Sequence, residues 1–172
     1  MKEKNLNKID KFIYNFLKKN VDVMPKRLGK IIALYYTDAR IRKKYSKFIQ
    51  VEMGEGTYAN LGLKVVPNEN PICVHIGANV SIAPNVTFLA GTEPNNSKEL
   101  KKIPYIKEQA AYFKDIYVDD DAWIGAGAII FPGIRIGKGS IIGAGSVVRH
   151  DTEPYCVYAG VPAKKIKEIP RT

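Results

Sequence analysis

The sequence offers few side chains that could act as a base or a nucleophile. Its 172 residues include two histidines, His75 and His150, and two cysteines, Cys73 and Cys156. Histidine is the most frequent general base because its unperturbed pKa of about 6.5 lies near neutral pH. The cysteines are far apart and have neither metal nor redox spacing. We therefore expect no resident metal, and two unpaired cysteines suit a reducing cytoplasm.

His75 precedes a regular stretch of the sequence, and its alternation with Ile76 predicts an outward side chain. From there it could face a substrate cleft and act as a base. A surface histidine whose hydrogen bonds are satisfied within the chain is the alternative. Sequence alone leaves both interpretations open.

A repeat of six residues organises positions 118 to 148. Aliphatic residues stand six apart at Val118, Ile124, Ile130, Ile136, Ile142 and Val148. A second set, offset by four, is mostly small: Ala122, Ala128, Ile134, Ser140 and Ser146. A period of six fits neither a helix nor a simple alternating strand. It predicts short strands and turns repeated along a coil, with the aliphatic residues stacked in one shared core.

Helices are expected before the coils, over residues 1–50. Residues 5–19 place an apolar set on one helical face: Leu6, Ile9, Phe12, Ile13, Phe16 and Leu17. We expect this face to pack against the rest of the protein. Because lysines occupy much of the remaining surface, weak contact with a membrane surface is the alternative. A second helix is expected over residues 25–48, with a basic end that suits a helix C-terminus.

The coils are expected over residues 51–168, followed by a short tail at 169–172. Their period is lost between Leu89 and Tyr117, in a polar segment rich in lysine. We expect a protruding loop over residues 89–117, with a short helix around 105–113. A long loop on a regular solenoid usually carries function.

The net charge of +10 at pH 7 narrows the choice of partners. A basic chain can bind nucleic acid, an anionic membrane or an acidic ligand. The sequence contains no nucleic-acid-binding module, so we expect no nucleic acid partner. It also shows no signal peptide and no run of eighteen apolar residues, which favours a cytoplasmic location.

Several motifs within the coils resemble a known family. They are His75-Ile-Gly-Ala-Asn-Val-Ser-Ile-Ala-Pro-Asn-Val, Trp123-Ile-Gly, Pro132-Gly-Ile-Arg-Ile-Gly, Ile142-Gly-Ala-Gly-Ser-Val-Val and Ala159-Gly-Val-Pro-Ala-Lys. The chain resembles the hexapeptide-repeat acyltransferases over about residues 51–168, and within them it is most similar to the maltose, galactoside and polysaccharide O-acetyltransferases. The resemblance implies a left-handed parallel β-helix, a homotrimer, acetyl-CoA as acyl donor and a sugar or polysaccharide hydroxyl as acceptor.

The expected base departs from the family pattern. In that family it is a histidine within Thr-His-Pro, and the same place here is Thr92-Glu93-Pro94. Glu93 is therefore the candidate catalytic residue, with His75 as a substitute. A carboxylate is weaker than imidazole by about two pK units, although burial can raise its pKa. A solvated loop residue without a catalytic role is the alternative for Glu93.

The resemblance also assigns binding residues. The acceptor-binding positions are Asn60 and Ser46, and the CoA-binding positions are Trp123, Ala126, Ala144, Arg149, His150, Lys164 and Lys167. Small side chains suit a pantetheine arm that must approach the backbone, and lysines suit the nucleotide phosphates. Structural turn residues and a plain basic tail are the competing interpretations.

We therefore predict an acetyl-CoA-dependent O-acetyltransferase built on a β-helix with N-terminal α-helices. Two alternatives remain. An N-acetyltransferase acting on an amino sugar needs less help from a base, which would suit Glu93. A catalytically inactive binding or scaffold module is the other. Two histidines are too few for the three-histidine zinc site of carbonic anhydrases with similar architecture.

Overall fold

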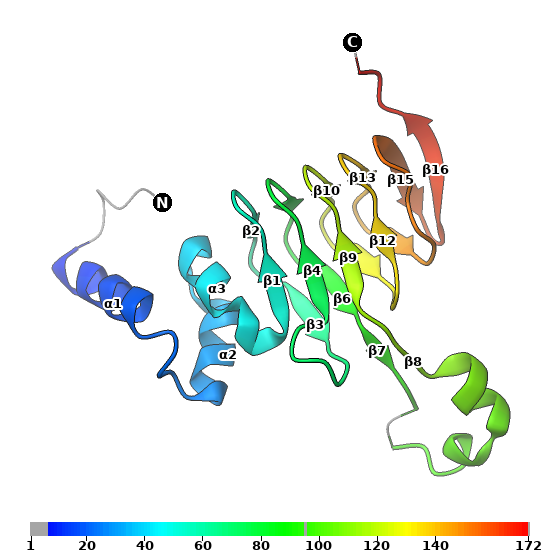
Figure 1. Cartoon of the computed structure of the whole chain (residues 1–172), viewed down its shortest axis with the longest axis horizontal. Helices are drawn as coiled ribbons and strands as arrows, with labels where there is room; N and C mark the ends of the chain where they lie inside the picture. Colours follow the sequence, from blue (N-terminus) through cyan, green and yellow to red (C-terminus); the bar gives the residue numbers. More distant parts are fainter. Residues whose placement is uncertain (1–6, 95, 172) are drawn as a thin grey trace.

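The computed structural model describes residues 7–94 and 96–171, which form mainly sheet with helices at the N-terminal end (Figure 1). The helices are α1 (Lys8–Lys19), α2 (Lys26–Tyr35), α3 (Ala39–Tyr45) and the 3-10 helix η2 (Ser46–Ile49). No helix among these described residues is long and apolar enough to cross a membrane.

The single helix predicted over residues 25–48 is wrong, because the chain breaks it after Tyr35. Tyr36 is extended, with φ −64° and ψ 138°, and ends α2. Asp38 then caps α3, because its carboxylate accepts a hydrogen bond from the Arg40 amide. The guanidinium of Arg40 pairs with the same carboxylate at 2.6 Å, which holds the pKa of Asp38 below its usual value.

The packing expected for the first helix is also largely wrong. Tyr14 and Leu17 are its buried residues. The Tyr45 hydroxyl donates to the Leu17 carbonyl at 3.0 Å, and the Arg40 guanidinium lies 5.1 Å from the centre of the Tyr14 ring. These contacts attach α1 to α3. Most of the predicted apolar face stays exposed, and Leu6 lies outside the described residues.

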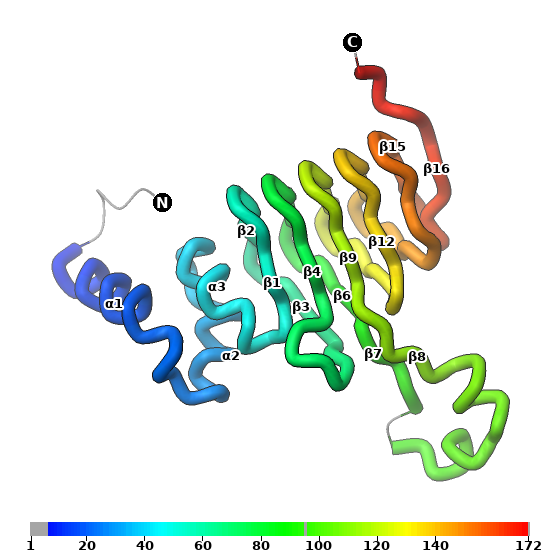
Figure 2. The backbone as a smooth tube through the Cα atoms, in the orientation of Figure 1, coloured from blue at the N-terminus to red at the C-terminus, as the bar shows by residue number. Residues whose placement is uncertain are grey.

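The strands wind through three parallel sheets, which form the sides of a solenoid (Figure 2). The first side contains β1 (Val51–Met53), β4 (Val74–Ile76), β9 (Ile116–Val118) and β12 (Arg135–Ile136). The second contains β2 (Tyr58–Ala59), β5 (Ser81–Ile82), β10 (Trp123–Ile124), β13 (Ile141–Ile142) and β15 (Cys156–Gly160), with β16 (Ala163–Glu168) antiparallel at its edge. The third contains β3 (Lys64–Val66), β6 (Thr87–Leu89), β11 (Ile129–Ile130) and β14 (Val147–Val148). Consecutive strands pass from one side to the next, so each circuit adds one coil.

The core is a stack of inward side chains with one residue from each side in each coil. On the second side, register places Ile82, Ile124 and Ile142 next to one another. All three are at most 1 % exposed. The six-residue spacing predicts this stack, because each side and its corner together use six residues.

A long loop leaves the coils between the third and first sides (Figure 1). It includes β7 (Gly91–Thr92), η3 (Leu100–Lys102), the π-helix η4 (Ile106–Ala110) and β8 (Tyr112–Phe113). Strands β7 and β8 pair antiparallel and form its stem. The short helix expected around residues 105–113 is thus a π-helical turn followed by a strand.

Two neighbouring residues of β13 test the inward stack. We expect Ile142→Ala to lower the free energy of unfolding by about 2–5 kcal/mol, because the removed atoms leave a cavity between coils. Ile141→Ala, on the outward side of the same strand, should cost about 1 kcal/mol or less. Urea denaturation at one fixed protein concentration measures both. Equal costs would contradict the assigned inward face.

Candidate active site

Glu93 lies at the stem of the long loop, immediately after β7. It is exposed, and its carboxylate forms no ion pair or hydrogen bond among residues 7–94 and 96–171. The stem lies at the corner where the third side passes to the first. A side chain in this place is free to meet a ligand or a second chain, and nothing within the described residues buries it.

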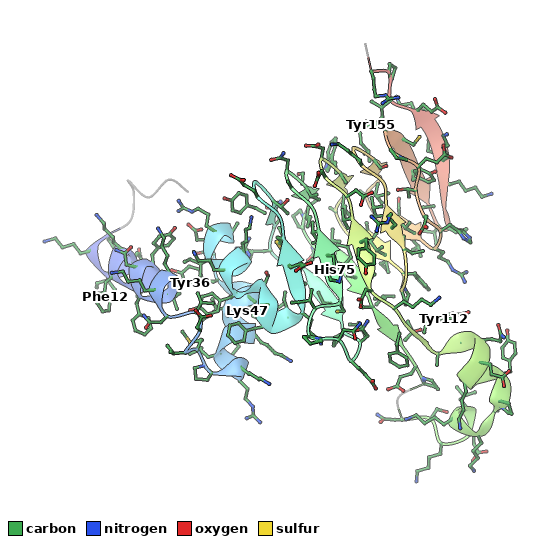
Figure 3. The ribbon with its side chains drawn as sticks, in the orientation of Figure 1. Phe12, Tyr36, Lys47, His75, Tyr112 and Tyr155 are labelled. Atoms are coloured by element: carbon green, nitrogen blue, oxygen red, sulfur yellow. The ribbon has the colours of Figure 1, made fainter. Side chains whose placement is uncertain are left out.

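His75 is partly buried on the outer surface of the first side, where register places it between Glu52 and Tyr117 (Figure 3). Its Nδ1 lies 2.5 Å from Glu52 Oε1. Its Nε2 is buried and lies 3.5 Å from Asp115 Oδ2, beyond good hydrogen-bonding distance. The ring stacks on Tyr117 at 4.8 Å between centroids. Because both nitrogens face carboxylates, this geometry does not suit a base acting on an external hydroxyl.

Asp115 connects the end of the long loop to the turn before β4. Its Oδ1 accepts hydrogen bonds from the side-chain amides of Asn68 at 2.8 Å and Asn70 at 2.9 Å. Burial raises the pKa of Asp115, but hydrogen bonds from Asn68 and Asn70, together with the electrostatic influence of the nearby His75 ring, outweigh it and hold that pKa below the usual value. This network fixes the point at which the loop returns to the first side.

The sequence analysis missed Glu52 and Asp115. Glu52 is 23 residues from His75, and Asp115 is 47 residues from Asn68. No local motif connects residues at these separations. Only the parallel register of β1 and β4 places Glu52 directly beside His75.

A column of small, exposed residues marks the corner between the second and third sides. The Gly127 amide donates to the Pro84 carbonyl at 3.0 Å, and the Gly145 amide donates to the Ala126 carbonyl at 2.8 Å. Pro84, Ala126 and Ala144 therefore succeed one another, one to each coil. Because their side chains are short, an extended ligand could approach the backbone along this corner.

The surroundings of this column hold most of the other predicted CoA-binding residues. Trp123 is 54 % exposed on the adjoining second side. Lys164 and Lys167 are exposed on β16, opposite Ala159 and Val157 of β15. An aromatic surface and two lysines thus share the second side with the small-residue corner.

Arg149 and His150 lie elsewhere. They follow β14 at the corner between the third and first sides, and both are exposed. The Arg149 guanidinium lies 5.4 Å from the centre of the Phe131 ring. These two residues therefore share a corner with the stem that carries Glu93. The opposite edge of the third side carries Ala126 and Ala144.

The two predicted acceptor-binding residues differ in accessibility. Asn60 is exposed after β2, and its amide donates to the Ile82 carbonyl at 3.1 Å. Ser46 is 5 % exposed. Both line a cavity of about 10 Å³, which has room for one water molecule but not for a sugar ring. Burial therefore weighs against the role predicted for Ser46.

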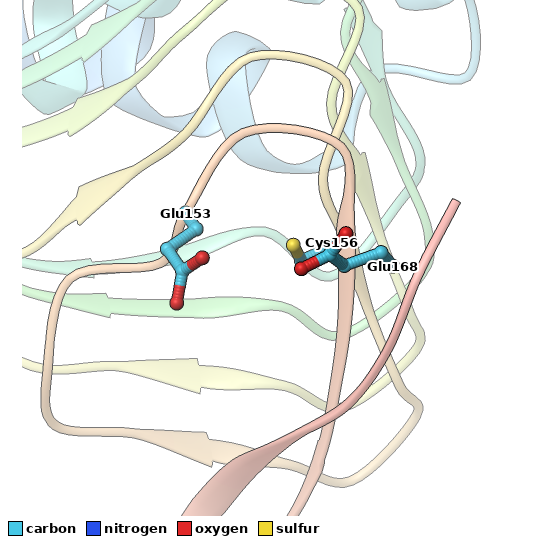
Figure 4. A group of neighbouring side chains, drawn as sticks. All are labelled: Glu153, Cys156 and Glu168. Atoms are coloured by element: carbon cyan, nitrogen blue, oxygen red, sulfur yellow. The ribbon is translucent and has the colours of Figure 1, made fainter. Parts of the chain in front are cut away.

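One cluster has the composition of a metal site. Glu153, Cys156 and Glu168 place ligand atoms within 4.8 Å of one another (Figure 4). The Lys165 ammonium donates to Glu153 at 2.8 Å and to Glu168 at 3.0 Å. These hydrogen bonds raise the pKa of Lys165 and place a cation between the two carboxylates. Lys165 therefore already offsets part of the negative charge that would attract a metal.

Comparison with known proteins decides the family. Residues 115–150 match the family described as bacterial transferase hexapeptide (six repeats). A putative acetyltransferase from Dictyostelium discoideum is 36 % identical over 152 residues, which cover 87 % of this chain and 73 % of that protein. The chain belongs to the hexapeptide-repeat acetyltransferases.

Two further comparisons concern a relative that matches over about half of its sequence and a solved structure with a similar fold. The galactoside O-acetyltransferase of Lactococcus lactis subsp. lactis (strain IL1403) is 39 % identical over 119 residues, covering 69 % of this chain. The match spans about half of that relative, 53 %. A galactoside acetyltransferase in complex with coenzyme A superposes with a TM-score of 0.64 at 31 % identity, covering 88 % of this chain and 84 % of the other.

Asp115 gives the site a pH-dependent contribution to stability. Because its folded-state pKa is lowered, its contribution is present above the unfolded-state pKa of about 3.9 and is lost as pH falls through the folded value. We therefore expect Asp115→Asn to be less stable than the parent chain at pH 7, with the difference shrinking below about pH 4.

Denaturation midpoints between pH 7 and pH 3 measure this difference. Asp121→Asn is the matched control, because Asp121 approaches Lys138 only at 3.8 Å on an exposed corner. A difference between Asp115→Asn and the parent that stays constant across this range would contradict the role of the carboxylate charge.

Proposed function

We propose that this protein is an acetyl-CoA-dependent O-acetyltransferase acting on a hydroxyl of a sugar or polysaccharide unit. The observation that carries the proposal is the small-residue column of Ala126 and Ala144 beside Trp123, Lys164 and Lys167. With a neighbouring copy of the chain against it, this corner would line a groove that offers backbone groups to a pantetheine arm and positive charge to nucleotide phosphates. A relative named galactoside O-acetyltransferase and a similar structure holding coenzyme A support the choice of acceptor and donor.

We further propose a left-handed β-helix that assembles as a homotrimer. The division of the candidate residues between two corners supports this assembly. Ala126 and Ala144 lie at one edge of the third side, whereas Arg149, His150 and the Glu93 stem lie at the other. In a ring of three copies, one corner of each chain meets the other corner of its neighbour, so the two groups complete a shared site.

Cys73 and Cys156 are both unpaired, which fits the cytoplasm as the place of action.

In this assignment Glu93 accepts the proton of the acceptor hydroxyl. The hydroxyl oxygen attacks the thioester carbonyl of acetyl-CoA, the new C–O bond forms as the C–S bond breaks, and the departing CoA sulfur takes the proton back from Glu93 to leave as the thiol. Asn60 lies at the same corner as Ala126 and would orient the acceptor. The exposure of Glu93 leaves it free to enter a neighbouring chain's groove, beside the bound thioester. His75 is the weaker candidate, because Glu52 and Asp115 flank its nitrogens.

One observation favours a second activity, the N-acetylation of an amino sugar. Glu93 stands where the resemblance leads us to expect a histidine. A neutral amine is already nucleophilic, so a weaker base is sufficient for it. The two activities differ in the acceptor alone and share the groove for acetyl-CoA. A module that binds without catalysing would share that groove as well.

Calorimetric titration with CoA tests the donor site without any choice of acceptor. We expect saturable binding that weakens about tenfold when CoA lacks its 3′-phosphate, or when Lys164 or Lys167 is changed to Ala, since a hydrogen bond to a charged group is lost. Lys101→Ala, in the long loop, is the control of equal charge. Failure to bind CoA at millimolar concentration would overturn the enzyme assignment.

The catalytic role of Glu93 is tested by Glu93→Gln. We expect kcat to fall by about a hundredfold or more, because the amide cannot accept the proton, while the Kd for CoA stays unchanged. Glu99→Gln, an exposed residue of the same loop, should leave kcat unchanged. Release of the CoA thiol in the presence of sugar and amino-sugar acceptors provides the assay. Unchanged turnover in Glu93→Gln would exclude this residue as the base.

A further inference from the structure

The outward face of α1 is apolar and carries large side chains. Ile9, Phe12, Ile13 and Phe16 are 71, 71, 40 and 51 % exposed. Their spacing of three and four residues places them on one face of the helix. The buried residues Tyr14 and Leu17 lie on the other side, against α3. No segment among the described residues covers the outward apolar face.

A basic strip accompanies this apolar face. Lys8, Lys11 and Lys19 are exposed and form no ion pairs among residues 7–94 and 96–171. Their spacing places them beside Phe12 on the outward half of the helix. Asp10, in the first turn, is the one acidic residue of α1. The outward half of α1 therefore carries apolar side chains on one strip and lysine ammonium groups on the strip beside it.

The position of α1 leaves this surface accessible from outside. The helix lies at the end of the molecule opposite β15 and β16, and Phe12 lies on it far from the coils (Figures 1 and 3). An exposed lysine and an exposed arginine also begin α2, at Lys26 and Arg27. The chain as a whole carries a net charge of +10.

From this geometry we propose that α1 binds the surface of an anionic lipid bilayer. A helix of this kind lies in the plane of the interface, with its apolar side chains among the acyl chains and its lysines against the headgroups. The charge favours lipid over a second copy of the chain, because two copies meeting on this face would bring two lysine strips together. The surface is separate from the small-residue corner, so the proposal does not depend on the acetyltransferase assignment.

Sedimentation of the intact chain with lipid vesicles tests the proposal. We expect binding to vesicles of phosphatidylcholine containing about a third phosphatidylglycerol, weaker binding to pure phosphatidylcholine, and loss of binding at high salt. The double variant Phe12→Ser with Phe16→Ser should bind more than tenfold more weakly, because two inserted rings are lost. Lys8→Glu with Lys19→Glu should also weaken binding more than tenfold.

Tyr105→Ser is the matched control for the apolar change. Tyr105 is 66 % exposed and belongs to the long loop. Figure 1 shows this loop well away from α1. The variant should leave vesicle binding unchanged. Circular dichroism and CoA titration on each variant verify that the fold and the donor site are intact.

Three results would overturn the proposal. The first is that the intact chain does not sediment with anionic vesicles at low salt. The second is that the phenylalanine variant sediments as well as the parent. The third is that the parent binds no lipid while the α1 substitutions change its oligomeric state, which would show that protein covers this face.

Discussion

The stacking of inward aliphatic side chains between successive coils is the contact on which the rest of the structure depends. Each parallel strand has only two to five residues, too few to form an independent sheet, so a coil is stable only against its neighbours. Ile82, Ile124 and Ile142 illustrate this dependence, since each closes the apolar space beneath the next. The three sides, the corners and the loop all take their positions from this stack. Function can therefore be carried by outward residues without loss of the core.

Most of the candidate site residues lie at the corners, where outward side chains do not belong to the stacked core. At the corner between the second and third sides, short residues at Ala126 and Ala144 expose backbone. At the corner between the third and first sides, the regular path is interrupted by the long loop, and Asp115 anchors the loop where it returns. The two corners face different directions in one chain. In the homotrimer proposed above, neighbouring copies would bring the two corners together.

The N-terminal helices have a different physical character from the coils. They cover the first coil through α2, α3 and η2, whereas α1 attaches by a small contact around Tyr14 and Leu17. Much of the apolar area of α1 is consequently left to the outside. Positive charge on the same half of the helix sets the chemistry of any surface that it meets. The coils and the helices thus present separate surfaces, one suited to a small extended ligand and one to a broad anionic surface.

The sequence by itself determined the coil, its inward residues and the place of the loop. A period of six fixes these features because each side and corner use a constant number of residues, which is a local property. The expected apolar face of α1 was present in the sequence, but whether that face is covered depends on what lies beside it. Only the tertiary structure decided the break after Tyr35, the burial of Ser46, and the pairing of His75 with Glu52 and Asp115. It also decided the distribution of the candidate residues between two corners. The contact of His75 with Glu52 depends on the register of strands 23 residues apart, and no local pattern encodes that register.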